Sequence, residues 1–107
     1  MKTSLKAPQK GFYYHYKHDP KGTLNNYSYE VLGVSRHTET EEYGVMYRPL
    51  YKNTYLAGAD FSIRPLGMFN GDVEKDGITV PRFVKITDQK VIDELEKIRD
   101  EMYPEII

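Results

Sequence analysis

The segment "NYSYEVLGVSRHTETEEYGVMYRPLY", residues 26–51, contains two stretches typical of β-strands separated by a short polar one. Residues 26–37 and 43–51 are rich in tyrosine and valine, which favour strands. The stretch "TETEE" between them is too short and too polar to be more than their connection. The segment therefore predicts an antiparallel hairpin. The first strand of this hairpin is long enough that Gly33 is expected to mark a bend or a bulge.

Further strands are expected on both sides of this hairpin. In residues 11–18, "GFYYHYKH", aromatic side chains alternate along the chain with period two, and this predicts a first strand. Residues 19–26 carry turn-forming proline, glycine and asparagine. Residues 52–60 are expected to form a loop, and residues 61–66 a short strand ended by proline. Residues 72–86 contain Asp76-Gly77 between two alternating stretches, which is a strong hairpin signal.

These five or six short strands favour a mainly β fold, a small antiparallel β-barrel that is SH3-like in size and strand content. Residues 67–71 are expected to form a turn whose Met68 and Phe69 plug one end of the core. The apolar spacing changes after residue 87 and predicts an amphipathic helix over 88–102, capped by Thr87 or Asp88 and packed on the barrel. Asp93 and Lys97 lie one turn apart and are expected to pair.

The length of 107 residues predicts a single domain. We expect a flexible N-terminal tail at 1–10, a β-barrel at 11–86 and a C-terminal helical segment at 87–107. The net charge of -1 does not support a polybasic surface for nucleic acid, and the absence of cysteine excludes disulfides and thiolate chemistry. The opening residues lack the apolar run of a signal peptide or membrane anchor, so the expected location is cytoplasmic.

The order of these motifs resembles a small bacterial family, domain of unknown function 1653. The resemblance covers roughly residues 11–83 and depends on "GFYYHYKH", "YEVLGVSRHTET", "YGVMYRPLY", "IRPLGMF" and "GITVPRF". Two positions depart from the family pattern. Pro49 stands where an alanine is usual, and Phe61 or Ser62 replaces the usual tryptophan. Because the family's activity is unassigned, the resemblance implies no reaction.

Seven polar residues fall within the matched motifs and are the candidate ligand-binding residues. The guanidinium of arginine suits carboxylate or phosphate, and neighbouring tyrosines offer stacking surfaces. Six of the seven lie after the first strand, and we expect the side chains of at least four of these six to converge on one patch. The ligand face is expected at the hairpin end around Arg36, His37 and Glu39. Alternatively, the arginines are structural, and they bind free carbonyls where strands end or pair with Glu39, Glu41 or Glu42. The seven residues are His15, Arg36, His37, Glu39, Arg48, Arg64 and Arg82.

The chemistry of this set favours a binding module for a small anionic or nucleotide-like ligand. One alternative is a small hydrolase-type enzyme, in which the carboxylate of Glu39 orients the imidazole of His37 on the same side of an extended chain. Another is a protein-interaction domain that uses exposed tyrosines. No cofactor is expected, since the sequence lacks a P-loop and a dinucleotide fingerprint. No metal site is expected either, because His15 and His18 should face opposite sides of a strand.

Overall fold

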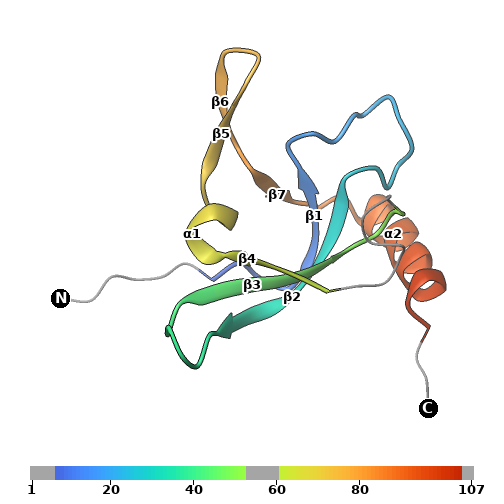
Figure 1. Cartoon of the computed structure of the whole chain (residues 1–107). Helices are drawn as coiled ribbons and strands as arrows, with labels where there is room; N and C mark the ends of the chain where they lie inside the picture. Colours follow the sequence, from blue (N-terminus) through green and yellow to red (C-terminus); the bar gives the residue numbers. More distant parts are fainter. Residues whose placement is uncertain (1–6, 53–60, 105–107) are drawn as a thin grey trace.

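The computed structural model describes residues 7–52 and 61–104. Its main element is a five-stranded antiparallel sheet in the order β4-β3-β2-β1-β7, and a separate hairpin is formed by β5 and β6 (Figure 1). The strands are β1 (Gly11–His15), β2 (Ser28–Arg36), β3 (Tyr43–Pro49), β4 (Ser62–Pro65), β5 (Asp72–Lys75), β6 (Ile78–Pro81) and β7 (Phe83–Lys85), and the helices are α1 (Leu66–Phe69) and α2 (Gln89–Met102).

The strands β2 and β3 form the predicted hairpin, which lies within the sheet between β4 and β1. Val31 pairs with Tyr47 and Val34 pairs with Val45, but the register shifts between Val31 and Gly33. This irregularity confirms the bulge expected near Gly33. Because of the shift, Val31 and Val34 lie on the same face of the sheet although three positions separate them.

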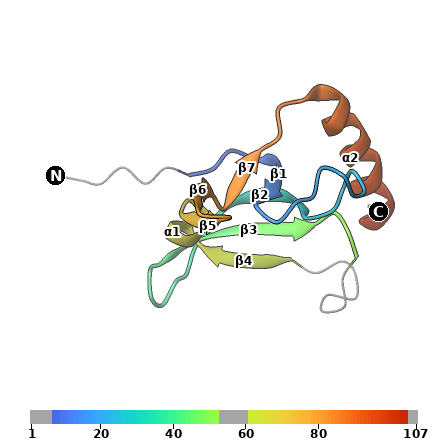
Figure 2. The same ribbon diagram turned by 90° about the horizontal axis from the view of Figure 1, so that it is seen from above.

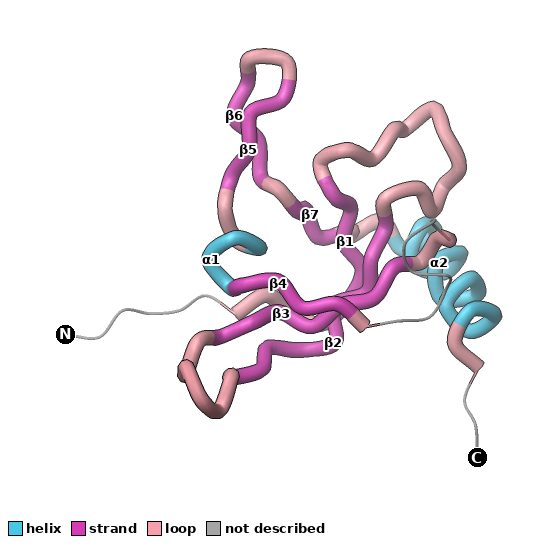
Figure 3. The backbone as a smooth tube through the Cα atoms, viewed as in Figure 1, coloured by secondary structure: helices cyan, strands magenta, loops and turns pink. Residues whose placement is uncertain are grey.

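A mainly β, antiparallel architecture with a C-terminal helix is therefore confirmed (Figure 3). The expected closed, SH3-like barrel is not found. The edge strands β4 and β7 do not pair in the part of the chain that the structure describes, and Figure 2 shows them at opposite edges of the sheet. The physical reason is that α1 follows Pro65 and leads the chain away from the sheet, and that β5 and β6 pair only with each other. Their turn has positive φ at Asp76 and Gly77, as expected for a tight hairpin.

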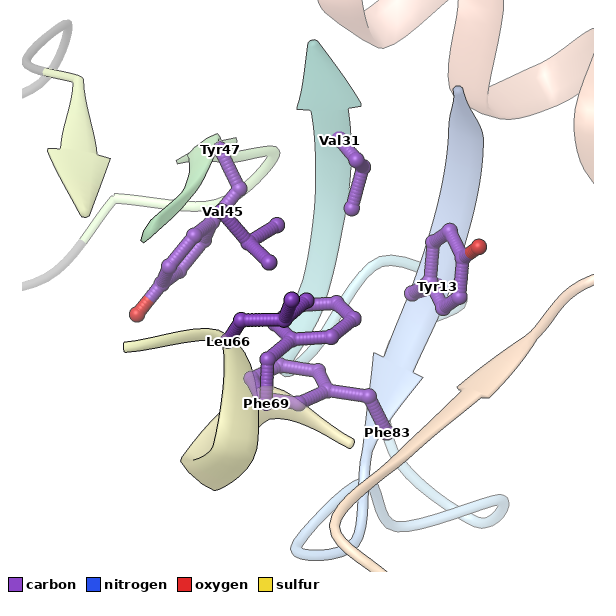
Figure 4. Close-up of a cluster of buried hydrophobic side chains, with 7 residues drawn as sticks. All are labelled: Tyr13, Val31, Val45, Tyr47, Leu66, Phe69 and Phe83. Carbon is purple, nitrogen blue, oxygen red and sulfur yellow. The ribbon is translucent and has the colours of Figure 1, made fainter. Parts of the chain in front are cut away.

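One face of the sheet is covered by an aromatic core to which α1 contributes (Figure 4). The Phe69 and Phe83 rings stack with centroids 4.2 Å apart. Phe69 therefore fills the core as predicted. Met68 does not, because it is 47% exposed on the outer side of α1. The buried members of this core are Tyr13, Val31, Val45, Tyr47, Leu66, Phe69 and Phe83.

The opposite face is covered by α2. Leu95 is buried against Phe12, Leu50 and Ile86, so the prediction that this helix packs on its own sheet is confirmed. The side chain of Asp88 caps the helix by accepting a hydrogen bond from the amide of Lys90.

The expected pair between Asp93 and Lys97 is not formed. Lys97 instead contacts Glu94 at 3.3 Å, and Asp93 accepts a hydrogen bond from Gln89 at 2.8 Å. Both of these contacts also join residues about one helical turn apart, so the surface of α2 is still stabilised by local side-chain pairs.

At the N-terminus, the hydroxyl of Tyr13 donates to the carbonyl of Gln9 at 2.9 Å. Most of the predicted tail and of the loop expected at 52–60 lie outside the described residues. Neither described helix is long and apolar enough to cross a membrane.

Candidate functional site

The seven residues predicted from the sequence lie in three separate places. Three are exposed at the end of the β2–β3 hairpin, one lies on the face covered by α2, and three lie around Phe83 on the opposite face. The expected convergence of four or more residues on one patch at the hairpin end is therefore not observed. The three groups are Arg36, His37 and Glu39; Arg48; and His15, Arg64 and Arg82.

At the hairpin end the polar side chains shape the turn. Nδ1 of His37 accepts hydrogen bonds from the amides of Glu39 and Thr40, both at 3.2 Å. Arg36 and Glu41 form a long, exposed ion pair at 3.8 Å. Glu39 thus contacts His37 through its amide, and no hydrogen bond joins its carboxylate to the imidazole. This geometry matches a hydrogen-bonded turn better than an acid–base pair.

Arg48 ties the central strands to α2. Oε1 of Glu30 accepts from Nε and Nη2 of Arg48, both at 2.9 Å, while Oε2 accepts from Arg99 of α2 at 3.2 Å. The Arg48 guanidinium also lies 4.1 Å from the centre of the Tyr103 ring. Arg48 is therefore engaged in a structural ion pair, although its partner is Glu30 and not the glutamates of the hairpin end.

The third group lies in a collection of rings at the end of β1, here called the His15 cluster. The His15 ring has four aromatic neighbours, Tyr16, Tyr27, Tyr29 and Phe83, with centroids 4.5 to 6.3 Å away. The cluster brings together residues on or next to β1, β2, β3, β4 and β7, and it consists of His15, Tyr16, Tyr27, Tyr29, Tyr51, Arg64, Arg82 and Phe83.

Tyr51, which follows β3, extends the cluster away from His15. Its ring lies 5.5 Å from that of Tyr27 and 5.6 Å from that of Tyr29. The hydroxyls of Tyr29 and Tyr51 also share a hydrogen bond. Two tyrosine rings are thereby held beside the histidine by contacts between different segments.

Two arginines bring positive charge to the His15 cluster. The Arg64 guanidinium lies 5.5 Å from the centre of the Phe83 ring, and its Nε donates to the Tyr47 hydroxyl at 3.3 Å. Nε of Arg82 donates to the carbonyl of Met68 at 3.1 Å. Within the described part of the chain, no contact found for either arginine involves a carboxylate. Among these residues, neither arginine therefore forms the ion pair that the structural alternative offers, although the bond from Arg82 to the Met68 carbonyl is a contact of the other kind that this alternative includes.

The ionisation of the His15 cluster follows from its position. Burial, and then the charges of Arg64, Lys17 and Arg82, lower the pKa of His15 to about 4. Burial and the hydrogen bond with Tyr51 raise the pKa of Tyr29 above the ordinary value for tyrosine. His15 and Tyr29 are thus uncharged at neutral pH, and the arginines give the cluster a net positive charge.

Hydrogen bonding fixes the tautomer of His15. Nδ1 accepts from the amide of Lys17 at 3.2 Å, so the proton of the neutral ring resides on Nε2. His15 is therefore a hydrogen-bond donor through Nε2 when it is uncharged.

The folded loop at residues 16–27 places Tyr27 in the cluster. The side chain of Asn26 bonds both the amide and the carbonyl of Asp19, at 2.8 and 2.9 Å, and the Tyr14 hydroxyl donates to the carbonyl of Leu24 at 2.6 Å. Tyr27 then takes a positive φ of 52° at the start of β2. These contacts agree with the turn chemistry predicted for this segment.

His18 does not join His15. It stacks on Tyr14 with ring centroids 3.6 Å apart, while His15 lies on the other face, so the two histidines point to opposite sides as expected. Among the residues that the structure describes, no three histidine or acidic side chains are grouped to hold a metal ion.

The fold and the polar motifs agree with one protein family. The model of the family DUF1653, described as a protein of unknown function, matches residues 11–85. The chain belongs to this family. The crystal structure of a DUF1653 protein from Bordetella bronchiseptica is similar, with a TM-score of 0.61 and 31% sequence identity. The similarity covers 78% of this chain and 92% of that chain. Comparison with curated proteins finds no match.

The segment that defines DUF1653 contains every member of the His15 cluster, whereas α2 lies beyond it. Sequence reasoning had found His15, Arg64 and Arg82 but not the surrounding rings. The alternation of β1 and β2 could have indicated part of this arrangement, because Tyr13 and His15 share a face and Tyr29 pairs with Tyr13. Tyr27 and Tyr51 lie outside strands, and no periodicity points to them.

Proposed function

We propose that this DUF1653 domain is a binding module for a small anionic ligand that also carries a planar ring, such as a nucleotide, and that the ligand binds at the His15 cluster. The single observation that carries this proposal is that two arginines lie beside a group of tyrosines and that neither has a carboxylate partner among the described residues. Arginine binds phosphate or carboxylate through charge-assisted hydrogen bonds. Tyrosine rings offer stacking surfaces for a base.

The character of the donors supports an anion over a cation. Arg64 uses Nε for the Tyr47 hydroxyl and Arg82 uses Nε for a carbonyl, which leaves the terminal guanidinium nitrogens of both as further donors. His15 adds the Nε2 donor of its neutral ring. A ligand rich in acceptors and negative charge complements such a set.

The position of Tyr27 supports recognition of a ring. Its side chain is 37% exposed, and it lies in the loop that precedes β2, beside His15 and Tyr51. An exposed ring backed by other rings can stack on a base without disturbing the core.

The test compares three probes that separate the anion from the ring: AMP, ribose 5-phosphate and adenosine. AMP should bind tightest and should shift the amide resonances of residues in the His15 cluster. Equal affinity for AMP and ribose 5-phosphate would show that the ring is not recognised. Shifts confined to residues 36–42, or no shifts at all, would contradict the proposed site.

Two substitutions sharpen this test. Arg64→Gln should weaken AMP binding about tenfold or more, because a hydrogen bond to a charged group contributes roughly 1.5–3 kcal/mol. Tyr27→Ala should weaken AMP but leave ribose 5-phosphate unchanged. Arg36→Gln is the matched control, since it removes an arginine from the exposed hairpin end and should not alter binding.

A further inference from the structure

We propose that anion binding at the His15 cluster is coupled to proton uptake by His15, so that the domain binds a phosphate-bearing ligand more tightly as the pH falls. This inference rests on the proposed function. It adds a regulation of the same site by pH, with His15 as the residue that takes the proton from solvent.

The argument begins with the groups that face His15. Tyr16 and Lys17 directly follow β1, Tyr27 directly precedes β2, Tyr29 lies within β2, and Phe83 begins β7. Arg64 of β4 and Arg82, just before β7, act on His15 through their charges. The charged members of this set are Lys17, Arg64 and Arg82, and all three are cations.

A protonated His15 would therefore add a fourth positive charge to a half-buried site in which the structure describes no acidic partner for it. This explains why burial and these cations lower the pKa of His15 to about 4 in the free protein. The ring remains neutral at the pH of most cells because the surroundings disfavour its charged form.

A bound phosphate reverses the local balance of charge. A dianion beside Arg64 and Arg82 places negative charge next to the imidazole, which favours the imidazolium and raises the pKa of His15. The proton goes to Nδ1, since Nε2 already carries one. Once protonated, Nδ1 no longer accepts a hydrogen bond from the amide of Lys17. That amide is exposed, so a water molecule can replace Nδ1 as its acceptor.

The size of the coupling follows from linkage. If binding restores the pKa of His15 from about 4 to its ordinary value of about 6.5, affinity increases about tenfold between pH 7.5 and pH 5.5. AMP itself loses negative charge near pH 6, and this opposes the effect. The comparison must therefore be made against a variant that lacks only the titrating ring.

The experiment measures AMP affinity at pH 7.5 and 5.5 for the native chain and for His15→Gln, whose amide keeps a neutral donor. The ratio of native to variant affinity should increase about tenfold at the lower pH. His37→Gln is the matched control and should behave as the native chain does.

A second measurement needs no variant. The imidazole resonances of the native chain, which has three histidines, are followed with pH in the presence and absence of AMP. The His15 signal should titrate near neutrality only in the complex. If AMP binds and the His15 signal is unchanged, the proton coupling is wrong while the proposed function stands. If AMP does not bind at either pH, both are overturned.

Discussion

Replacement of Leu95 by alanine tests whether α2 belongs to the fold of this domain or serves a partner. Leu95 is fully buried, at 0% exposure, in the core that joins α2 to Phe12, Leu50 and Ile86. The substitution removes three carbon groups, and at about 0.8 kcal/mol each the lost transfer energy is about 2.4 kcal/mol. The cavity left behind raises the expected cost to about 2.5 to 4 kcal/mol.

Urea unfolding followed by circular dichroism measures this cost directly. The control is Glu96→Ala on the next position of α2, which is exposed and should change the free energy of unfolding by less than about 0.5 kcal/mol. For a domain of this size, each kcal/mol lowers Tm by about 4–8 °C, so a thermal melt gives an independent check. A cost for Leu95→Ala as small as that of the control would refute the packing argument and would point to α2 as a surface for another protein.

Two further predictions concern charged groups. Glu30→Gln should reduce the free energy of unfolding by about 1 to 3 kcal/mol, because it leaves Arg48 and Arg99 without their shared, largely buried carboxylate. Urea unfolding measures the change, and a loss no larger than that of an exposed control such as Glu74→Gln would contradict the structural role of the network. His15 should make the domain less stable in acid. Its pKa is about 4 when folded and about 6.5 when unfolded. The unfolded chain therefore binds more protons between these values, and stability is lost as the pH falls from 6.5 towards 4. After allowance for solvent at a half-buried site, the loss should be about 1 to 2 kcal/mol. The free energy of unfolding of His15→Gln should not show this loss between pH 6.5 and 4. A variant whose stability falls with pH as steeply as that of the native chain would refute the prediction.

The sequence predicts the elements of this fold better than their assembly. The central hairpin, its bulge and α2 are determined by local signals such as alternating tyrosine and valine, Gly33, and the Asp88 cap. Barrel closure depends instead on whether β4 and β7 meet. That pairing is decided by where α1 leads the chain after Pro65, which no local pattern specifies.

The same division applies to the candidate site. Residue chemistry singles out His15, Arg64 and Arg82, which lie together in the His15 cluster, but it also assigns Arg48 to the same patch. The partner of Arg48 is Glu30, which faces it across the ladder of β2 and β3. This contact depends on the register in which the two strands pair. The polar residues along the sequence do not by themselves specify that register. Similarly, Met68 and Phe69 are adjacent apolar residues on one turn of helix, and only the packing of that turn decides which is buried.

The bulge in β2 has a consequence for how this domain tolerates changes in length. Leu32 falls between two correctly paired stretches, since Val31 faces Tyr47 and Gly33 faces Met46. Loss of this one residue would join the stretches into a regular ladder and leave each remaining side chain on its present face. Loss of a residue elsewhere in the strand would transfer the following side chains to the wrong face. The bulge at Leu32 is thus where β2 can lose one residue and keep the same two cores.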